Sequence, residues 1–293
     1  MTPEEVTREV RRLEITTRHL VRDIVAGEYS SAFRGRGVEF AEVREYQPGD
    51  DIRTIDWNVT ARLGAAFVKR YLEERELTVV FVVDRSASGG FGSLVRTRGD
   101  LAAEVVAVLA FAAARNNDRV GLVLATDRVE SFTQPRKGRR HALRVISELL
   151  AFEPEGRGTD LGAALSTLEA SLRRRAVIFL VSDFLTAGFE AALARLARRH
   201  DLVAIQIVDP RERELPDSGL VTLWDPETGD WRVVNTSDRR VRERFSERAS
   251  AFDRALERML TERGADLLRL ENGRSYAEPL LAFFRRRESM LWR

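Results

Sequence analysis

Three side chains that could bind a metal ion follow one apolar segment of the sequence. The β-branched run Thr78 to Val83 leads directly into Asp84, Ser86 and Ser88. A short apolar run bounded by polar turn residues is typical of a central parallel strand. Ligands of open α/β sheets bind beyond the carboxyl ends of the strands, so an acid and two hydroxyls on alternate residues there could face one point. The sequence therefore predicts a metal ion at this point.

Two further oxygen donors occur later in the chain. Thr159 lies in the segment 156–162, which opens a predicted helix, and Asp183 ends a second predicted strand. All five side chains offer oxygen, and no imidazole or thiolate is among them, so the expected cation is hard: Mg²⁺ or Mn²⁺ first and Ca²⁺ next. The alternative is a polar strand end without metal, because Asp and Ser hydrogen-bond their own loops in many turns.

The elements that must position these donors alternate between strand and helix from residue 77 onward. Strands are predicted at 77–83, 119–126, 129–132, 176–183, 202–209 and 265–270, and helices at 100–115, 139–152, 160–172, 189–199, 238–263 and 276–286. This order argues for an α/β fold with a doubly wound, mostly parallel sheet. Two alternating runs around Pro226-Glu227-Thr228-Gly229 predict an inserted β-hairpin at 220–236.

The N-terminal part has a different pattern. Apolar residues between Val6 and Val25 predict an amphipathic helix, and residues 38–71 predict a β-rich arm in which Pro48-Gly49-Asp50 makes a turn between extended runs. We expect two domains, 1–76 with the helix and arm and 77–293 with the sheet. Three acids of the arm are either a second acidic site where a partner docks or turn caps that pair with Arg residues while Trp57 packs. The acids are Asp50, Asp51 and Asp56, and the Arg residues are Arg44, Arg53 and Arg62.

Composition excludes several classes of function. Lys and Arg number 48 against 46 Asp and Glu, so the formal net charge of +2 gives no argument for binding nucleic acid. The chain has no cysteine and therefore neither disulfides nor thiolate metal ligands. Its first residues lack the apolar core of a signal peptide, and the longest apolar run, Leu101 to Ala114, contains Glu104 and is too short to cross a bilayer. We expect no membrane span and a cytoplasmic location.

Three motifs together resemble the metal-ion-dependent adhesion site of von Willebrand factor type A domains. They are DRSAS at 84–88, GTDLGAAL at 158–165 and VSDF at 181–184. The resemblance implies that Ser86, Ser88 and Thr159 are hydroxyl ligands, that Asp84 and Asp183 bind the ion directly or through water, and that one vertex is left for an acidic side chain of a partner. Hydroxyls add no negative charge, so the ion stays electrophilic and gains from an incoming carboxylate.

A narrower resemblance extends over nearly the whole chain. It rests on GRGVEFAEVREYQPGDDIRTIDWNVTAR at 35–62, DRVGLVLATDRVE at 118–130 and GRRHALRVISELLAF at 138–152. These segments are similar to the bacterial domain of unknown function 58 family, type A-like proteins that are usually encoded beside MoxR-type AAA+ ATPases. The resemblance implies a partner acid on such an ATPase or on its client.

Three hypotheses of function follow. The first is a metal-dependent protein-interaction module, a cytoplasmic adaptor without catalytic residues, because no nucleophile and base pair is visible in the sequence. The second is a metal-dependent hydrolase or phosphotransfer enzyme that uses the two acids beside a hard cation. The third is a scaffold with a vestigial metal site that works through the β-rich arm and the Arg-rich helices.

Overall fold

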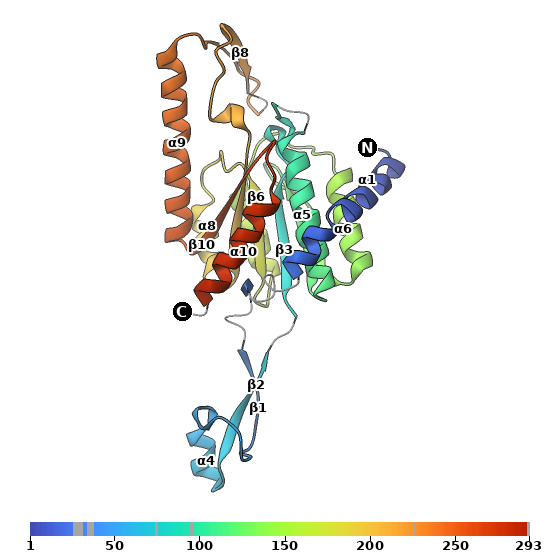
Figure 1. The fold of residues 1–293 in the computed structure, drawn as a ribbon, viewed down its shortest axis with the longest axis vertical. Helices are drawn as coiled ribbons and strands as arrows, with labels where there is room; N and C mark the ends of the chain where they lie inside the picture. The colour runs from blue at the N-terminus through green and yellow to red at the C-terminus, as the bar shows by residue number, and fades with distance from the viewer. Residues whose placement is uncertain (26–31, 34–37, 74–75, 94–95, 226, 292–293) are drawn as a thin grey trace. The chain divides into compact units, whose positions relative to one another are not determined.

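The chain forms two compact units in its computed structural model. The structure describes residues 1–25, 32–33, 38–73, 76–93, 96–225 and 227–291 (Figure 1). The main domain comprises Met1–Phe33 and Leu77–Arg293, and the arm comprises Arg34–Glu76. The expected N-terminal domain 1–76 is therefore wrong in part. Its first helix, α1 (Pro3–Thr16), buries one apolar stripe in the main core, and only the remainder forms a separate unit.

The main domain is built on a six-stranded sheet. The strand order is β10-β7-β6-β3-β4-β5, and every pairing is parallel except that of β4 with β5. The strands are β3 (Thr78–Asp84), β4 (Arg119–Ala125), β5 (Val129–Lys137), β6 (Val177–Ser182), β7 (Asp201–Val208) and β10 (Ala265–Glu271). The doubly wound, mostly parallel sheet is thus confirmed. The strand β5 extends to Lys137, five residues beyond its predicted end at 132.

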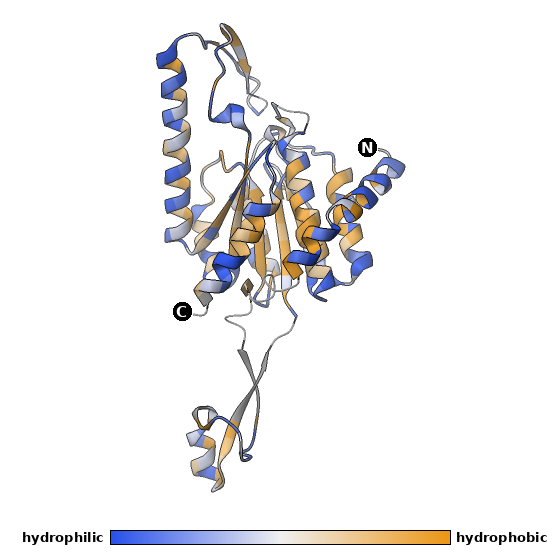
Figure 2. Ribbon diagram, in the orientation of Figure 1, coloured by the Kyte–Doolittle hydropathy of each residue, from blue (hydrophilic) through white to orange (hydrophobic). Residues whose placement is uncertain are grey.

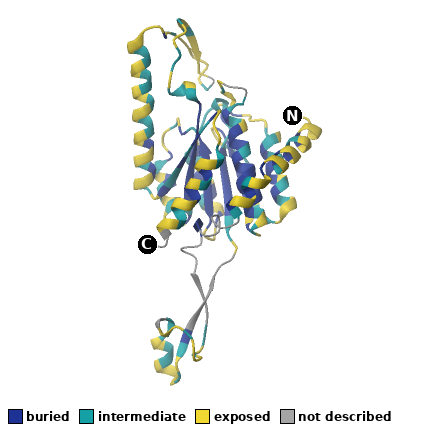
Figure 3. Ribbon diagram, viewed as in Figure 1, coloured by how far each residue is buried: buried dark blue, intermediate teal, exposed yellow. Residues whose placement is uncertain are grey.

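Helices cover both faces of this sheet, as Figures 1 and 2 show. One face packs against α1, α2 (Arg18–Asp23), α5 (Arg98–Arg115), α6 (Arg139–Ala151) and α10 (Ala277–Leu291). The other packs against α7 (Leu161–Ser171), α8 (Glu190–Ala197) and α9 (Arg239–Glu262). Alternate side chains of β3 enter the two layers, so this strand is buried on both faces (Figure 3).

The two central strands mark the point where the direction of winding reverses. β3 and β6 are neighbours, yet the helix after β3, α5, lies on one face while the helix after β6, α8, lies on the other. The loops that leave the two strands therefore diverge and open a crevice at the carboxyl edge, which is the usual ligand position in such folds. Asp84 and Asp183 lie at this edge, at the ends of the two strands.

The predicted N-terminal helix is interrupted. It ends at Thr16 and a second helix starts at Arg18. Thr17 lies at the junction, and its buried hydroxyl donates a 2.7 Å hydrogen bond to the carbonyl of Leu13. The segment 27–37, whose content of Gly, Ser and Arg predicts a loop, falls mostly outside the described residues.

The arm contains the predicted ribbon but also a helix that was not predicted. β1 (Val38–Glu45) pairs antiparallel with β2 (Phe67–Glu73), as expected. The extended run predicted between them is wrong, because the 3₁₀ turn η2 (Ile52–Thr54) and helix α4 (Trp57–Leu63) take its place. The carboxylate of Asp56 accepts hydrogen bonds from the N–H groups of Asn58 and Val59 and caps this helix, and Gly64 ends it with a φ of 74°.

Two of the three acids of the arm, Asp50 and Asp56, have the structural roles of the second alternative. Arg44 binds both carboxylate oxygens of Asp50 at 2.7 and 2.8 Å, and this bidentate pair holds the pKa of Asp50 below its ordinary value. Asp56 is the cap of α4. The packing expected for Trp57 is wrong, since 68% of its surface is exposed.

The hairpin predicted at 220–236 is present. β8 (Leu220–Trp224) and β9 (Trp231–Asn235) form a separate two-stranded antiparallel sheet. The rings of Trp224 and Trp231 stack across it with centroids 5.7 Å apart.

The helices of the described residues are all too short or too polar to cross a bilayer.

A buried carboxylate joins three segments at the carboxyl edge of the sheet. Asp209, which follows β7, accepts hydrogen bonds from the backbone of Ser93 and of Arg211 and from the amide of Asn272. Its exposed fraction is 0%. These bonds tie the loop after β3 and the end of β10 to β7.

We expect Asp209→Ala to lower the free energy of unfolding by about 2–4 kcal/mol, because buried donors would lose their acceptor. Urea denaturation followed by circular dichroism measures this change. Asp230→Ala, in the exposed turn of the hairpin, is the control and should stay within about 0.5 kcal/mol of the parent protein. Equal losses for both variants would contradict this role of Asp209.

Candidate metal centre

Asp84 is held between the two central strands. Its Oδ1 accepts a 2.9 Å hydrogen bond from the backbone of Ser86, and its Oδ2 accepts one of 2.7 Å from the hydroxyl of Ser182, the last residue of β6. Burial raises the pKa of Asp84, and the negative charge of Asp183 raises it further. The carboxylate is therefore fixed in position and in need of a positive neighbour.

Asp183 is placed by an unusual backbone turn. The next residue, Phe184, has a left-handed φ of 62°, which is rare for a bulky side chain. Burial of its ring beside that of Phe189 and a bond from its N–H to the hydroxyl of Ser182 hold this conformation. The turn leaves the Asp183 carboxylate beside the loop that follows β3.

The two serine hydroxyls lie between the acids. The chain turns back after Ser86 through the 3₁₀ turn η3 (Ala87–Gly90), so the hydroxyls of Ser86 and Ser88 come within 2.9 Å of each other. Ser88 also donates to Oδ2 of Asp183 at 3.0 Å. Direct contacts thus link four of the five predicted donors, namely Asp84, Ser86, Ser88 and Asp183.

Thr159 reaches the same place through a carboxylate that we did not predict. Its hydroxyl donates a 3.1 Å hydrogen bond to Oε1 of Glu227, at the tip of the hairpin, and Ser86 also hydrogen-bonds to this carboxylate. The loop before α7 is joined to the loop after β3 by a bond from the N–H of Ala87 to the carbonyl of Arg157. Thr159 and Ser86 therefore face one common group.

The oxygen spacing suits a small divalent ion. Octahedral Mg²⁺, with bonds of 2.0–2.1 Å, places neighbouring ligand oxygens about 3 Å apart. The separations of 2.9 Å between the hydroxyls of Ser86 and Ser88, and of 3.0 Å from Ser88 to Asp183, are ordinary hydrogen-bond lengths and are also compatible with this value. A cavity of about 20 Å³ lies beside these residues, enough for one water or one ion. The donors present thus fit the ion that the sequence motifs imply.

Hydroxyls would have to contribute to the binding of such an ion. Among the described residues, three or more His, Asp or Glu side chains nowhere gather in a way that could hold a metal. The centre instead combines two carboxylates with neutral oxygens, a set that would hold a hard cation without cancelling its charge.

An arginine that the sequence argument missed completes the centre. Arg98, in the first turn of α5, places its guanidinium 2.9 Å from Oδ2 of Asp183, and it also contacts Glu212 and donates to the carbonyl of Ser88. Only 5% of its side chain is exposed. A positive charge at a helix N-terminus is unfavourable because it opposes the helix dipole. The position of Arg98 in the first turn of α5 was therefore the one sign in the sequence that this residue has a specific role.

Glu227 is the second residue that we missed. The sequence predicts its turn but gives no sign that the turn reaches the strand ends. Burial raises the pKa of Glu227 and the charges of Asp183 and Asp84 raise it further, while the hydrogen bonds from Thr159 and Ser86 act in the opposite direction.

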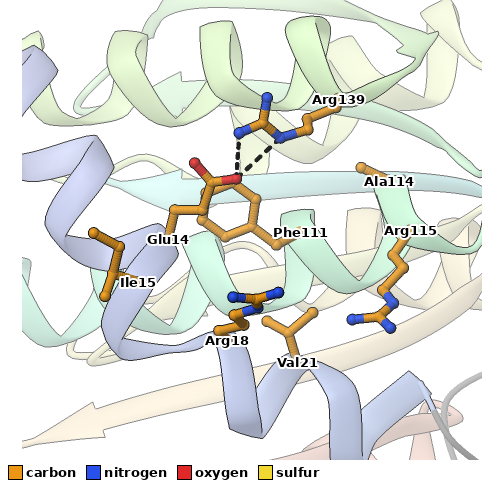
Figure 4. A pocket seen from close by; sticks show the side chains of 8 residues that line it. All are labelled: Glu14, Ile15, Arg18, Val21, Phe111, Ala114, Arg115 and Arg139. Carbon is orange, nitrogen blue, oxygen red and sulfur yellow. Dashed lines mark hydrogen bonds and ion pairs between the residues drawn. The ribbon is translucent and has the colours of Figure 1, made fainter.

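A larger hollow lies elsewhere in the main domain. It measures about 440 Å³ and is lined by residues of α1, α2, α5 and α6, with Phe111 and Val21 among its apolar side chains (Figure 4). At its edge Arg139 binds Glu14. None of the five predicted metal ligands lines it.

Sequence comparison identifies similar proteins. A family model described as "Protein of unknown function DUF58" matches residues 42–255. The uncharacterized protein Rv1480 of Mycobacterium tuberculosis is 34% identical over 277 residues, which cover 94% of this chain and 87% of that protein. The uncharacterized protein Mb1516 of Mycobacterium bovis gives the same values.

Comparison of structures agrees on the fold. An aerotolerance-related membrane protein from Bacteroides fragilis superposes with a TM-score of 0.51 and 16% identity, covering 73% of this chain and 99% of that one. The VWA domain of SpRpn10 gives 0.41 and 13%, covering 71% and 94%, a score too low to add to the argument.

We expect Arg98→Ala to lower the free energy of unfolding by about 3–5 kcal/mol in EDTA, because it leaves the buried carboxylate of Asp183 without its partner. Urea denaturation measures the loss. Arg211→Ala, which removes an exposed guanidinium from the residue before Glu212, should cost less than about 0.5 kcal/mol. An Arg98 variant as stable as the parent protein would show that the ion pair is dispensable.

Proposed function

The chain belongs to the family of proteins of unknown function DUF58 and has a type A-like fold, and from this premise we propose that it is a metal-dependent protein-interaction module. The observation that carries the proposal is the spacing of about 3 Å among the oxygens of Ser86, Ser88 and Asp183 beside a cavity of about 20 Å³. This arrangement supports one hard cation at the carboxyl edge of the sheet.

The cation in this proposal is Mg²⁺, with Mn²⁺ or Ca²⁺ as substitutes. Ser86, Ser88 and Thr159 offer hydroxyls, and Asp84 and Asp183 bind directly or through water. When bound, the ion supplies a concentrated positive charge that attracts a carboxylate. The chain's own residues favour this: three of the five donors are neutral, and Asp183 shares its charge with Arg98, so the site retains an affinity for an external acid.

The partner in this proposal is an acidic side chain of another protein. Resemblance to proteins encoded beside MoxR-type AAA+ ATPases favours such an ATPase, or its client, as the protein that carries the acid. We propose that the chain works as a cytoplasmic adaptor between the two. The formal net charge of +2 is near balance, which favours no nucleic-acid partner.

One observation favours a second candidate function, a scaffold that binds no metal. Arg98 already supplies a positive charge to Asp183, and a guanidinium can replace an ion as the counter-charge of a buried acid. In that case the strand ends are a structural joint and interactions occur elsewhere. The hydrolase hypothesis receives no comparable support, since the cavity beside the acids is lined by neither His nor Lys.

We expect calorimetry to detect Mg²⁺ or Mn²⁺ binding to the parent protein at millimolar concentrations or below, and binding at 100 times the dissociation constant to stabilise the fold by about 2.7 kcal/mol. The double variant Ser86→Ala, Ser88→Ala should bind at least about tenfold more weakly, because it removes two ligands. Ser250→Ala, on the exposed face of α9, is the matched control and should bind as the parent does. Absence of binding to the parent protein would favour the scaffold.

Recovery of a partner should depend on the same residues. With the MoxR-type ATPase of the same genome as the captured protein, we expect binding in Mg²⁺ that EDTA abolishes. Thr159→Ala and Asp183→Ala should lose most of the recovery, and Ser250→Ala should keep it. Equal recovery in every lane, with and without EDTA, would end the adaptor proposal.

A further inference from the structure

The hairpin β8–β9 gains little stability from the rest of the main domain. It pairs with no other strand, and an isolated two-stranded hairpin is at best marginally stable in water. Its large apolar side chains are mostly exposed: 74% for Leu220, 54% for Trp224, 66% for Trp231 and 68% for Val233. Burial in the core therefore does not explain its position.

The base of the hairpin is anchored beside α9. The N–H of Thr236 donates a 2.7 Å hydrogen bond to the carbonyl of Gly219, and Arg242, in α9, donates to the carbonyl of Thr236 and pairs with Asp217. These bonds fix where the two strands begin and end. The position of the tip depends on contacts that the tip itself makes.

The turn at the tip presents a glutamate to the candidate metal centre. Asp225 accepts a 2.9 Å bond from the N–H of Glu227, and its N–H and carbonyl close the turn with Asp230 and Gly229. Glu227 then extends to the hydroxyl of Thr159 at 3.1 Å. A tight turn thus places the carboxylate of Glu227 beside residues that were predicted to bind an ion and to leave one of its coordination positions open.

The charges of Asp183 and Asp84 oppose the negative charge of Glu227 at this position. Glu227 lies near Asp84 and Asp183, and its bonds here come from neutral hydroxyls. Arg98 is engaged with Asp183 and Glu212. Among the described residues the three carboxylates do not gather in a way that would hold an ion by themselves, so the hydroxyls must share it. A divalent ion held by both kinds of oxygen would turn the repulsion into attraction, and the hairpin would then have a reason to dock.

We propose that Glu227 is the chain's own acidic ligand for the ion. Its carboxylate takes the place that a partner's carboxylate must take. A partner therefore binds only by displacing the hairpin. This inference rests on the proposed function, because it needs the ion. It makes the interaction competitive, with the docked hairpin as the closed state. It also specifies the ligand chemistry as a glutamate or aspartate presented in a tight turn, of which residues 225–230, DPETGD, are the internal example.

Peptide binding to the full-length protein tests the competition. The probe is a fluorescent peptide with the sequence of residues 220–235, closed by a disulfide between added terminal cysteines, which the chain itself lacks. In Mg²⁺ we expect Glu227→Gln to bind it at least about tenfold more tightly than the parent protein, because the competing acid is gone. Asp230→Asn, which removes an exposed carboxylate from the same turn, should bind as weakly as the parent. EDTA, or a Glu-to-Gln change in the peptide, should abolish the binding.

Tryptophan fluorescence provides a second readout that needs no added ligand. Trp224 and Trp231 lie in the hairpin, so Mg²⁺ should change the emission of the parent protein and of Asp230→Asn but not of Glu227→Gln.

Calorimetry separates the two possible failures. If the parent protein and Glu227→Gln bind Mn²⁺, yet all variants bind the peptide equally, the inference is overturned and the proposed function stands. If none of them binds Mn²⁺, the proposed function is overturned and the inference with it.

Discussion

The structure at the carboxyl edge depends on the electrostatic cost of placing two carboxylates at adjacent strand ends inside a protein. Asp84 and Asp183 follow β3 and β6, and each raises the energy of the other's negative charge where solvent screening is weak. Desolvated acids of this kind persist only with hydrogen bonds and a counter-charge. Ser182 and the backbone of Ser86 supply the hydrogen bonds, and Arg98 supplies one positive charge.

The fold makes this convergence possible because neighbouring strands send their helices to opposite faces. The loops that diverge from β3 and β6 leave room for the segment before α7 to approach, and glycine allows it to come close. A Cβ on Gly156 would lie 2.3 Å from the hydroxyl of Thr126, at the end of β4. Any larger residue would push this loop, and Thr159 with it, away from the acids.

The sequence predicted the sheet, and it predicted that four of the five candidate donors lie at the ends of two neighbouring strands, because both features depend on local patterns. A continuous apolar run such as that of β3 is long enough to identify a buried strand, and motifs at strand ends inherit their position from the sheet. Arg98 and Glu227 could not be predicted in this way, since their contacts depend on how a helix and a distant hairpin meet the strand ends. The helix α4 was missed for a smaller reason: a single cap, Asp56, decides between two conformations of a short polar segment.

Arg98 and a divalent ion would each offset the same excess of negative charge, and the position of Glu227 bears on which of them does so. Without an ion, a third carboxylate directed at this centre adds repulsion that the hydrogen bonds from Thr159 and Ser86 oppose, and the hairpin is otherwise held by the bonds at its base. The hydrogen bonds that the hydroxyls of Thr159 and Ser86 donate to this carboxylate are each worth about 1.5–3 kcal/mol if the carboxylate is ionised. In the proposed function a divalent ion is the cation that would hold Glu227 at this position, and displacement of Glu227 would make the position available to another protein.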